Sequence, residues 1–145
     1  LQEKRIAELL RGFPYHICVH WYSGTEQDLE PYLDMGCYFT LGPDFSAACG
    51  SVADRRLLRG FSKEEKKQKR SLYQRMLQEI PVERLFIETD GISAVAWTMG
   101  EAEAEWNMLP FALQANMQSL AEATGKNEAE LQQQLCRNLG RFLQG

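Results

Sequence analysis

The sequence has few cysteines, few histidines and no long apolar stretch. Its 145 residues include four cysteines and two histidines. The cysteines (Cys18, Cys37, Cys49 and Cys136) are too widely separated to make a C-x-x-C zinc motif. No run approaches the roughly 18 to 20 apolar residues that a membrane-spanning helix needs. These absences exclude a zinc finger and a membrane span, so we expect reduced thiols, no membrane contact and a cytoplasmic location.

Positive charge is also in short supply. Sixteen Lys and Arg stand against twenty Asp and Glu, which gives a net charge of -4. The chain therefore has no overall basic field to attract nucleic acid, and any such affinity must come from a local patch. A hydrophobic fraction of 44% and a charged fraction of 25% are typical of a globular domain.

The residue pattern predicts helices and strands in alternation. Caps are expected at Thr25 with Asp28, at Ser62 with Glu65, and at Asn127 with Glu130. The expected strands are 15–22, 37–41 and 85–90. The expected helices are 2–11, 25–36, 63–79, 109–124 and 128–142. Pro31 is expected to kink or shorten the second, and the last has a core-facing stripe of Leu131, Leu135, Leu139 and Phe142. Segment 44–60 is expected to be a loop with a short helix, and 91–105 a loop. Such alternation favours an α/β fold with parallel strands.

Three strands cannot close a barrel or make a fully covered sheet. A complete (β/α)8 barrel takes roughly 250 residues, and open edges invite pairing with other strands. The chain also begins within an amphipathic helical pattern. We therefore expect residues 1–145 to be one piece of a larger fold, with the missing strands supplied by the same natural chain or by another.

Three polar residues lie at or near the ends of predicted strands. Glu88 and Asp90 lie two apart, so they share a face at the end of the last strand, and His20 lies near the end of the first. The carboxyl ends of parallel strands meet at one edge, so we expect His20 and Asp90 to face each other there. An imidazole and a carboxylate provide half of a typical divalent-metal shell. Taken singly, His20 is also compatible with a core histidine and Asp90 with a turn cap.

Several segments resemble one family of enzymes. Residues 19–24 are VHWYSG and residues 85–90 are LFIETD, similar to the H-C-F-S-G and L-L-I-E-T-D strands of TatD-family metal-dependent nucleases, members of the metallo-dependent hydrolase superfamily. Residues 33–39, 80–85 and 138–143 are similar to that family's L-D-L-G-F-Y-I, I-P-L-D-R-L and terminal N-x-x-x-L-F segments. These segments occur in the family's order.

The resemblance places residues 1–145 in the second half of the family's (β/α)8 barrel. It lacks the first-strand H-x-H, the fourth-strand Glu and the fifth-strand His, so we expect the chain alone to be inactive. It implies that His20 and Asp90 bind a divalent metal ion (Mg, Mn or Zn) and that Asp90 also accepts a proton from the attacking water. It further implies that Glu88 contacts these ligands and not the ion itself. The implied reaction is hydrolysis of phosphodiester bonds in nucleic acid, with DNA as the expected partner.

Two departures from the family bear on the substrate. The family continues after its last strand with A-P-Y-L and a basic stretch, whereas this chain carries Glu101, Glu103 and Glu105. An acidic loop beside the site is expected to repel phosphate. The connection after Leu41 is long and leads into nine basic residues that can compensate: Arg55, Arg56, Arg59, Lys63, Lys66, Lys67, Lys69, Arg70 and Arg75. Arg55, Arg56 and Arg59 precede the helix and are the phosphate candidates, while the lysine run is expected to be a solvated helix face.

Other interpretations stay open. The chain is also compatible with a non-catalytic TatD-like interaction subunit, for example in anti-phage defence. A third interpretation is an amidohydrolase-type enzyme that acts on a small molecule, since that superfamily shares the barrel. Trp97 and Trp106 are candidates to stack a base or to pack against the rim.

Overall fold

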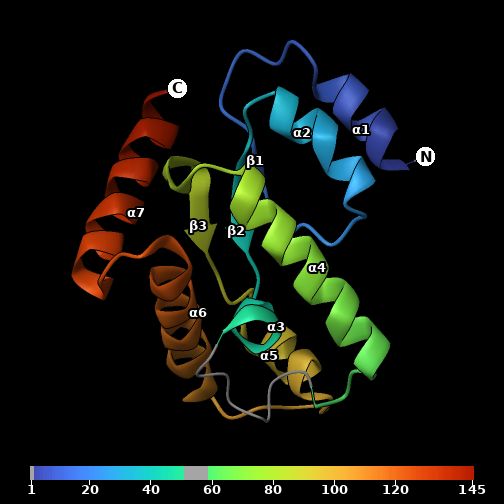
Figure 1. Cartoon of the computed structure of the whole chain (residues 1–145), viewed down its shortest axis with the longest axis vertical. Helices are drawn as coiled ribbons and strands as arrows, with labels where there is room; N and C mark the ends of the chain where they lie inside the picture. The colour runs from blue at the N-terminus through green and yellow to red at the C-terminus, as the bar shows by residue number, and fades with distance from the viewer. Residues whose placement is uncertain (1, 51–58) are drawn as a thin grey trace.

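A small parallel sheet lies at the centre of the molecule and is flanked by helices (Figure 1). This computed structural model describes residues 2–50 and 59–145. The strands β1 (Cys18–Val19), β2 (Tyr38–Leu41) and β3 (Leu85–Ile87) pair in the order β1-β2-β3, and both pairings are parallel. The predicted α/β class with parallel strands is confirmed, although each strand is shorter than predicted.

The helices account for most of the described chain. Those between the strands are the 3-10 helix η1 (Gln27–Leu29), α2 (Glu30–Asp34), α3 (Phe45–Cys49), α4 (Lys63–Glu79) and the 3-10 helix η2 (Val82–Arg84). Before and after the sheet lie α1 (Gln2–Leu10), α5 (Ile92–Met99), α6 (Met108–Thr124) and α7 (Glu128–Gln144). The capping boxes predicted at Ser62 with Glu65 and at Asn127 with Glu130 are both present.

Two predictions about local structure are wrong. Segment 91–105 contains α5, which sequence periodicity missed because the helix is apolar on nearly every side and carries no polar stripe. The helix predicted for 25–36 is split into η1 and α2. Of the two effects expected of Pro31, a kink or a shorter helix, the structure shows the shorter helix. This proline lies in the first turn of α2, where its missing N–H is not needed.

One face of the sheet is the hydrophobic core. Phe39 and Leu41 of β2 and Leu85 of β3 are at most 1% exposed, and they share a core cluster with Met76 of α4 and Leu131 of α7. The opposite face carries aromatic rings at its amino-terminal end. There Tyr38 and Phe86 stack with centroids 5.8 Å apart, and Phe142 of α7 meets Tyr38 edge-on.

The buried face of α7 differs from the predicted leucine stripe. Leu131 is fully buried, but Leu139 is 49% exposed. Asn138 is buried in its place, and its side-chain amide donates to the carbonyls of Val82 (2.7 Å) and Leu85 (2.9 Å). The prediction for Leu139 was wrong because a buried polar residue, satisfied by the start of β3, sets the rotation of the helix.

Candidate metal centre

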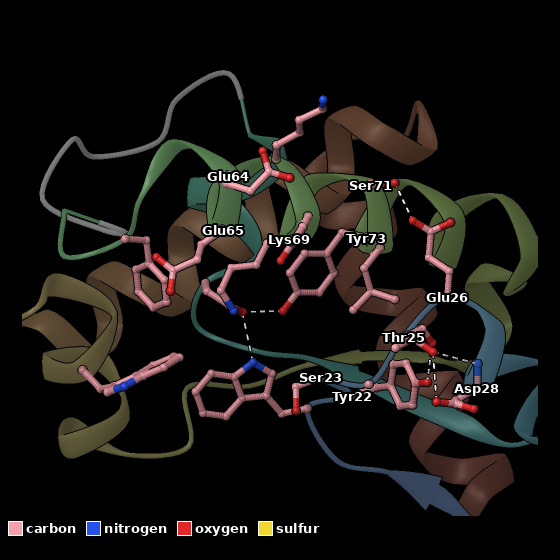
Figure 2. A pocket seen from close by; sticks show the side chains of 18 residues that line it. Tyr22, Ser23, Thr25, Glu26, Asp28, Glu64, Glu65, Lys69, Ser71 and Tyr73 are labelled. Atoms are coloured by element: carbon pink, nitrogen blue, oxygen red, sulfur yellow. Dashed lines mark hydrogen bonds and ion pairs between the residues drawn. The ribbon is translucent and has the colours of Figure 1, made fainter. Parts of the chain in front are cut away.

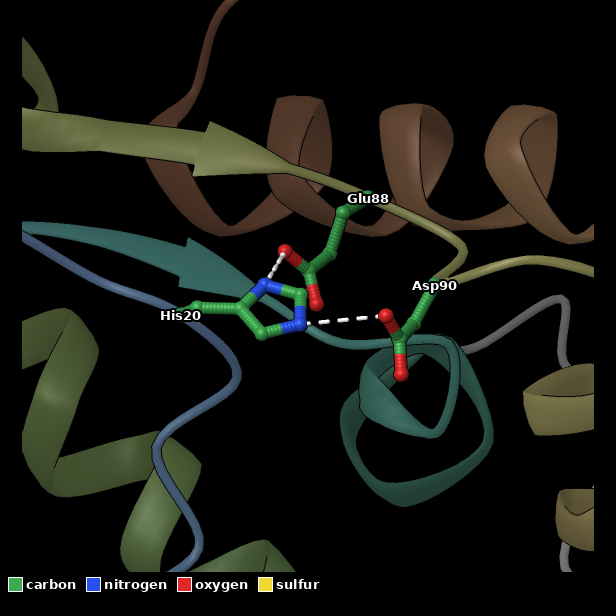
Figure 3. A group of neighbouring side chains, drawn as sticks. All are labelled: His20, Glu88 and Asp90. Carbon is green, nitrogen blue, oxygen red and sulfur yellow. Dashed lines mark hydrogen bonds and ion pairs between the residues drawn. The ribbon is translucent and has the colours of Figure 1, made fainter.

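His20, Glu88 and Asp90 meet at the carboxyl edge of the sheet. His20 follows β1, and the two carboxylates follow β3 (Figure 3). The imidazole lies between them, with Nδ1 2.5 Å from Glu88 Oε2 and Nε2 3.1 Å from Asp90 Oδ1. The predicted juxtaposition of His20 and Asp90 is thereby confirmed. Their role as metal ligands stays a prediction.

The three side chains differ in exposure, and this difference separates their roles. Glu88 is 14% exposed, whereas His20 and Asp90 are 59% and 42% exposed. When Nδ1–H donates to the recessed Glu88, the imidazole is held in the tautomer whose Nε2 lone pair points toward Asp90. Nε2 and Asp90 Oδ1 are then two accessible atoms that could bind a metal ion. Glu88 lies behind them as the group that orients the ring.

The backbone adopts a left-handed conformation at two positions of the site, at Asp90 and directly after His20. Trp21, directly after His20, has a φ of 40°, and Asp90 has a φ of 54°. Aspartate tolerates this region because its short side chain is polar, whereas tryptophan does not. The Trp21 N–H donates to Thr40 Oγ1 at 2.8 Å. The conformation of Trp21 coincides with the end of β1 at Val19, three residues before the predicted end at Tyr22.

A buried aspartate fixes the Trp21 side chain. Asp44 is 1% exposed. It accepts from the Trp21 indole N–H at 3.0 Å, from the Lys69 ammonium at 2.7 Å and from the Tyr73 hydroxyl. This network was not predictable from the sequence, because its residues come from three separate segments and make no motif.

The ends of β2 and β3 are joined by Asn116 of α6. This residue is fully buried. Its amide group donates to the carbonyls of Gly42 (2.8 Å) and Glu88 (3.3 Å), and its oxygen accepts from the Ser46 N–H at 3.0 Å. Asn116 therefore holds the backbone of Glu88 in place. A single asparagine in an amphipathic helix carries no signal of such a role.

The carboxylates make His20 a stronger base than an ordinary histidine. Burial lowers the pKa of His20, but the negative charge and hydrogen bond of Glu88 and the hydrogen bond and charge of Asp90 outweigh it, so that the pKa is raised overall. The neighbouring thiol does not join the site. Burial, with the charge of Glu88 and then of Cys37, raises the pKa of Cys18 to about 11, which keeps it protonated at neutral pH.

The donor set fits a divalent cation. One ligand atom from each of His20, Glu88 and Asp90 can be chosen so that all lie within 4.8 Å of one another. Glu88 Oε1 is buried and has no hydrogen-bond partner among the described residues. A buried carboxylate oxygen without a partner is unfavourable, and a nearby cation or its bound water would satisfy it. One imidazole nitrogen and carboxylate oxygens suit Zn²⁺ or Mn²⁺, and the carboxylates suit Mg²⁺.

The structure differs from our predictions at Lys69 and in the acidic segment. Arg55 and Arg56 lie outside the described residues, and Arg59 is exposed. Lys69 does not belong to a solvated helix face, because its ammonium pairs with the buried Asp44. The acidic segment begins beyond α5, whose 8 residues span about 12 Å. Glu101, Glu103 and Glu105 line a separate cavity that does not include Asp90.

The second histidine has a packing role. His16 Nδ1 lies 3.2 Å from the carbonyl oxygen of Phe142, and the ring stacks against Phe142 and contacts Tyr38. These contacts lie at the amino-terminal end of the sheet, away from His20. His16 is exposed and makes no contact with the residues of the site.

The parallel strands and their helical crossovers place a histidine and two carboxylates at the carboxyl edge of the sheet, which is where enzymes of the α/β-barrel class hold their active-site residues. The sequence profile of the TatD related DNase family matches residues 2–144, so the chain belongs to this family. No curated protein matches the chain. Among the described residues, none of the helices is both long and apolar enough to cross a membrane.

Proposed function

We propose that this chain contributes His20, Glu88 and Asp90 to the metal centre of a nuclease that hydrolyses phosphodiester bonds, with DNA as substrate. Family membership supports a hydrolase of DNase type. The observation that carries the proposal is the juxtaposition of His20 Nε2 and Asp90 Oδ1 at 3.1 Å, with Glu88 behind them. We further propose that the chain is the second half of a (β/α)8 barrel, and that a first half in the same or another chain completes the ligand set.

Each of the three residues has a separate task. His20 Nε2 and Asp90 Oδ1 would hold the metal ion, and Glu88 orients the imidazole through Nδ1. The ion, when bound, polarises a phosphoryl oxygen and lowers the pKa of the attacking water. Asp90 also has a second oxygen, which can accept the proton of that water. Carboxylates on both sides of His20 orient its ring toward the position of the ion.

The test is DNA hydrolysis by the chain together with the first half of the barrel. Asp90→Asn keeps the shape of the side chain but removes its charge and its basicity. We expect it to abolish metal-dependent cleavage while the fold is retained. The matched control is Asp34→Asn, because Asp34 is an exposed aspartate at the end of α2 and lies before β2, away from the carboxyl edge.

Two outcomes would contradict the proposal. Equal turnover by wild type and Asp90→Asn would show that Asp90 is not catalytic. A folded, metal-loaded wild type without activity on DNA or RNA would exclude a nuclease and favour an interaction subunit or a small-molecule hydrolase.

A further inference from the structure

A cavity opens directly beside the candidate metal centre. Its volume is about 490 Å³, and its lining includes Asp90, Trp21, Lys69 and Trp97. The last three residues also line a larger neighbouring cavity of about 800 Å³, shown in Figure 2. A substrate that is bound at the metal centre and extends into these two cavities would therefore contact Trp21, Lys69 and Trp97.

Trp97 is held in place and yet exposed. Its ring meets Trp21 edge-on at 5.6 Å and Phe61 at 4.9 Å between centroids. The Lys69 ammonium lies over it, 5.4 Å from the ring centroid, and is itself tied to Asp44. In spite of these neighbours Trp97 remains 51% exposed. Trp97 is therefore an aromatic ring that is already oriented and still accessible to a ligand in the cavity.

The ring and the cation together match the chemistry of a nucleotide. An aromatic ring stacks a base of any sequence, and a lysine next to it attracts phosphate. Of the three NH₃⁺ donors of Lys69, one is directed to Asp44. Trp21 is fixed by the same aspartate, so the wall of the cavity is rigid before any substrate arrives. A preorganised surface loses little entropy on binding.

We infer that Trp97 is a stacking platform for the base next to the scissile phosphate, with Lys69 beside it facing the nucleotide's phosphate. This inference rests on the proposed nuclease function and adds a residue that determines how the substrate is held. Trp97 is not a metal ligand and is not required for metal binding.

The test compares two probes that differ only in their bases. One is a short single-stranded oligothymidylate, and the other is an abasic oligodeoxynucleotide of equal length. Binding to the full chain is measured by fluorescence anisotropy in EDTA, so that the affinity does not depend on a metal ion. We expect Trp97→Leu to weaken oligothymidylate binding by about 5-fold to 150-fold and to leave the abasic affinity unchanged.

Two further variants control for folding and for exposed tryptophan in general. Trp97→Phe keeps an aromatic ring and should retain most of the affinity for oligothymidylate. Trp106→Leu removes another exposed tryptophan, 74% exposed and absent from both cavity linings, and should bind both probes as wild type does.

The outcomes separate this inference from the function on which it rests. If wild type binds both probes and Trp97→Leu weakens both equally or neither, the stacking platform is wrong and the nuclease function stands. The same holds if wild type does not distinguish the two probes. If wild type binds neither probe, both the nucleic-acid substrate and the platform are excluded.

Discussion

The residues proposed to bind the metal ion and the residues that hold the backbone around them are distinct. His20 and Asp90 are 59% and 42% exposed, whereas Asp44 is 1% exposed and binds the indole of Trp21, whose backbone is left-handed. Such a conformation is unfavourable by roughly 1 to 3 kcal/mol for a residue like tryptophan. Gly42 takes part as well, because a Cβ there would lie 2.1 Å from Trp21 Cδ1. Strain of this kind persists only where surrounding contacts enforce it.

Removing the charge of Asp44 should therefore destabilise the fold. In Asp44→Asn the Lys69 ammonium faces a neutral amide, and we expect a loss of about 3 kcal/mol in the free energy of unfolding, as for other broken buried pairs. Urea denaturation at neutral pH measures this loss as a lower midpoint with an unchanged slope. Asp34→Asn is the control. A variant within about 0.5 kcal/mol of wild type would show that the network does not hold Trp21.

At the scale of elements, the sequence predicted what local chemistry determines. The starts of α4 and α7 were predictable from their capping boxes, and β3 was predictable from a short apolar run. Helix α5 has no polar stripe, so its sequence shows no helical periodicity of polar and apolar residues. The early end of β1 at Val19 coincides with the contacts that Trp21 makes with Thr40 and Asp44. The pair His20 and Asp90 was predictable because both follow parallel strands, whereas Asp44 and Asn116 act only through tertiary contacts.

The capping box of α4 gives a pH-dependent prediction. Hydrogen bonds from the Ser62 backbone and side chain lower the pKa of Glu65 below its ordinary value of 4.5. The ionised carboxylate therefore stabilises the fold above that value, and the contribution is lost as the pH falls through the lowered pKa. Glu65→Gln keeps the cap geometry, so it should be less stable than wild type at neutral pH and equally stable in acid. Glu64→Gln, one position earlier in α4 and outside the box, is the control. A pH-independent difference in urea midpoints would contradict this explanation.

At the scale of the whole molecule, the sheet has two different faces. The face with Phe39, Leu41 and Leu85 is covered by helices of the chain itself. The other face has aromatic rings at the amino-terminal end of the strands and His20, Glu88 and Asp90 at the carboxyl end. In a (β/α)8 barrel, the inward face of each strand likewise carries packing side chains along its length and active-site side chains at its carboxyl end. This correspondence is the basis of the proposal that the chain is half of such a barrel.

The central claim is that a metal ion binds between His20 and Asp90, and the chain contains a natural internal control for it. Of its two histidines, His20 is in the site, and His16 lies four residues earlier, about 13 Å away along an extended chain. The most direct measurement is a titration with Mn²⁺ that follows the imidazole proton signals by NMR, since paramagnetic broadening falls steeply with distance. We predict selective broadening of the His20 signals in wild type and its loss in Asp90→Asn. Equal broadening of both histidines, or no effect of the Asp90 substitution, would contradict a metal centre at this position.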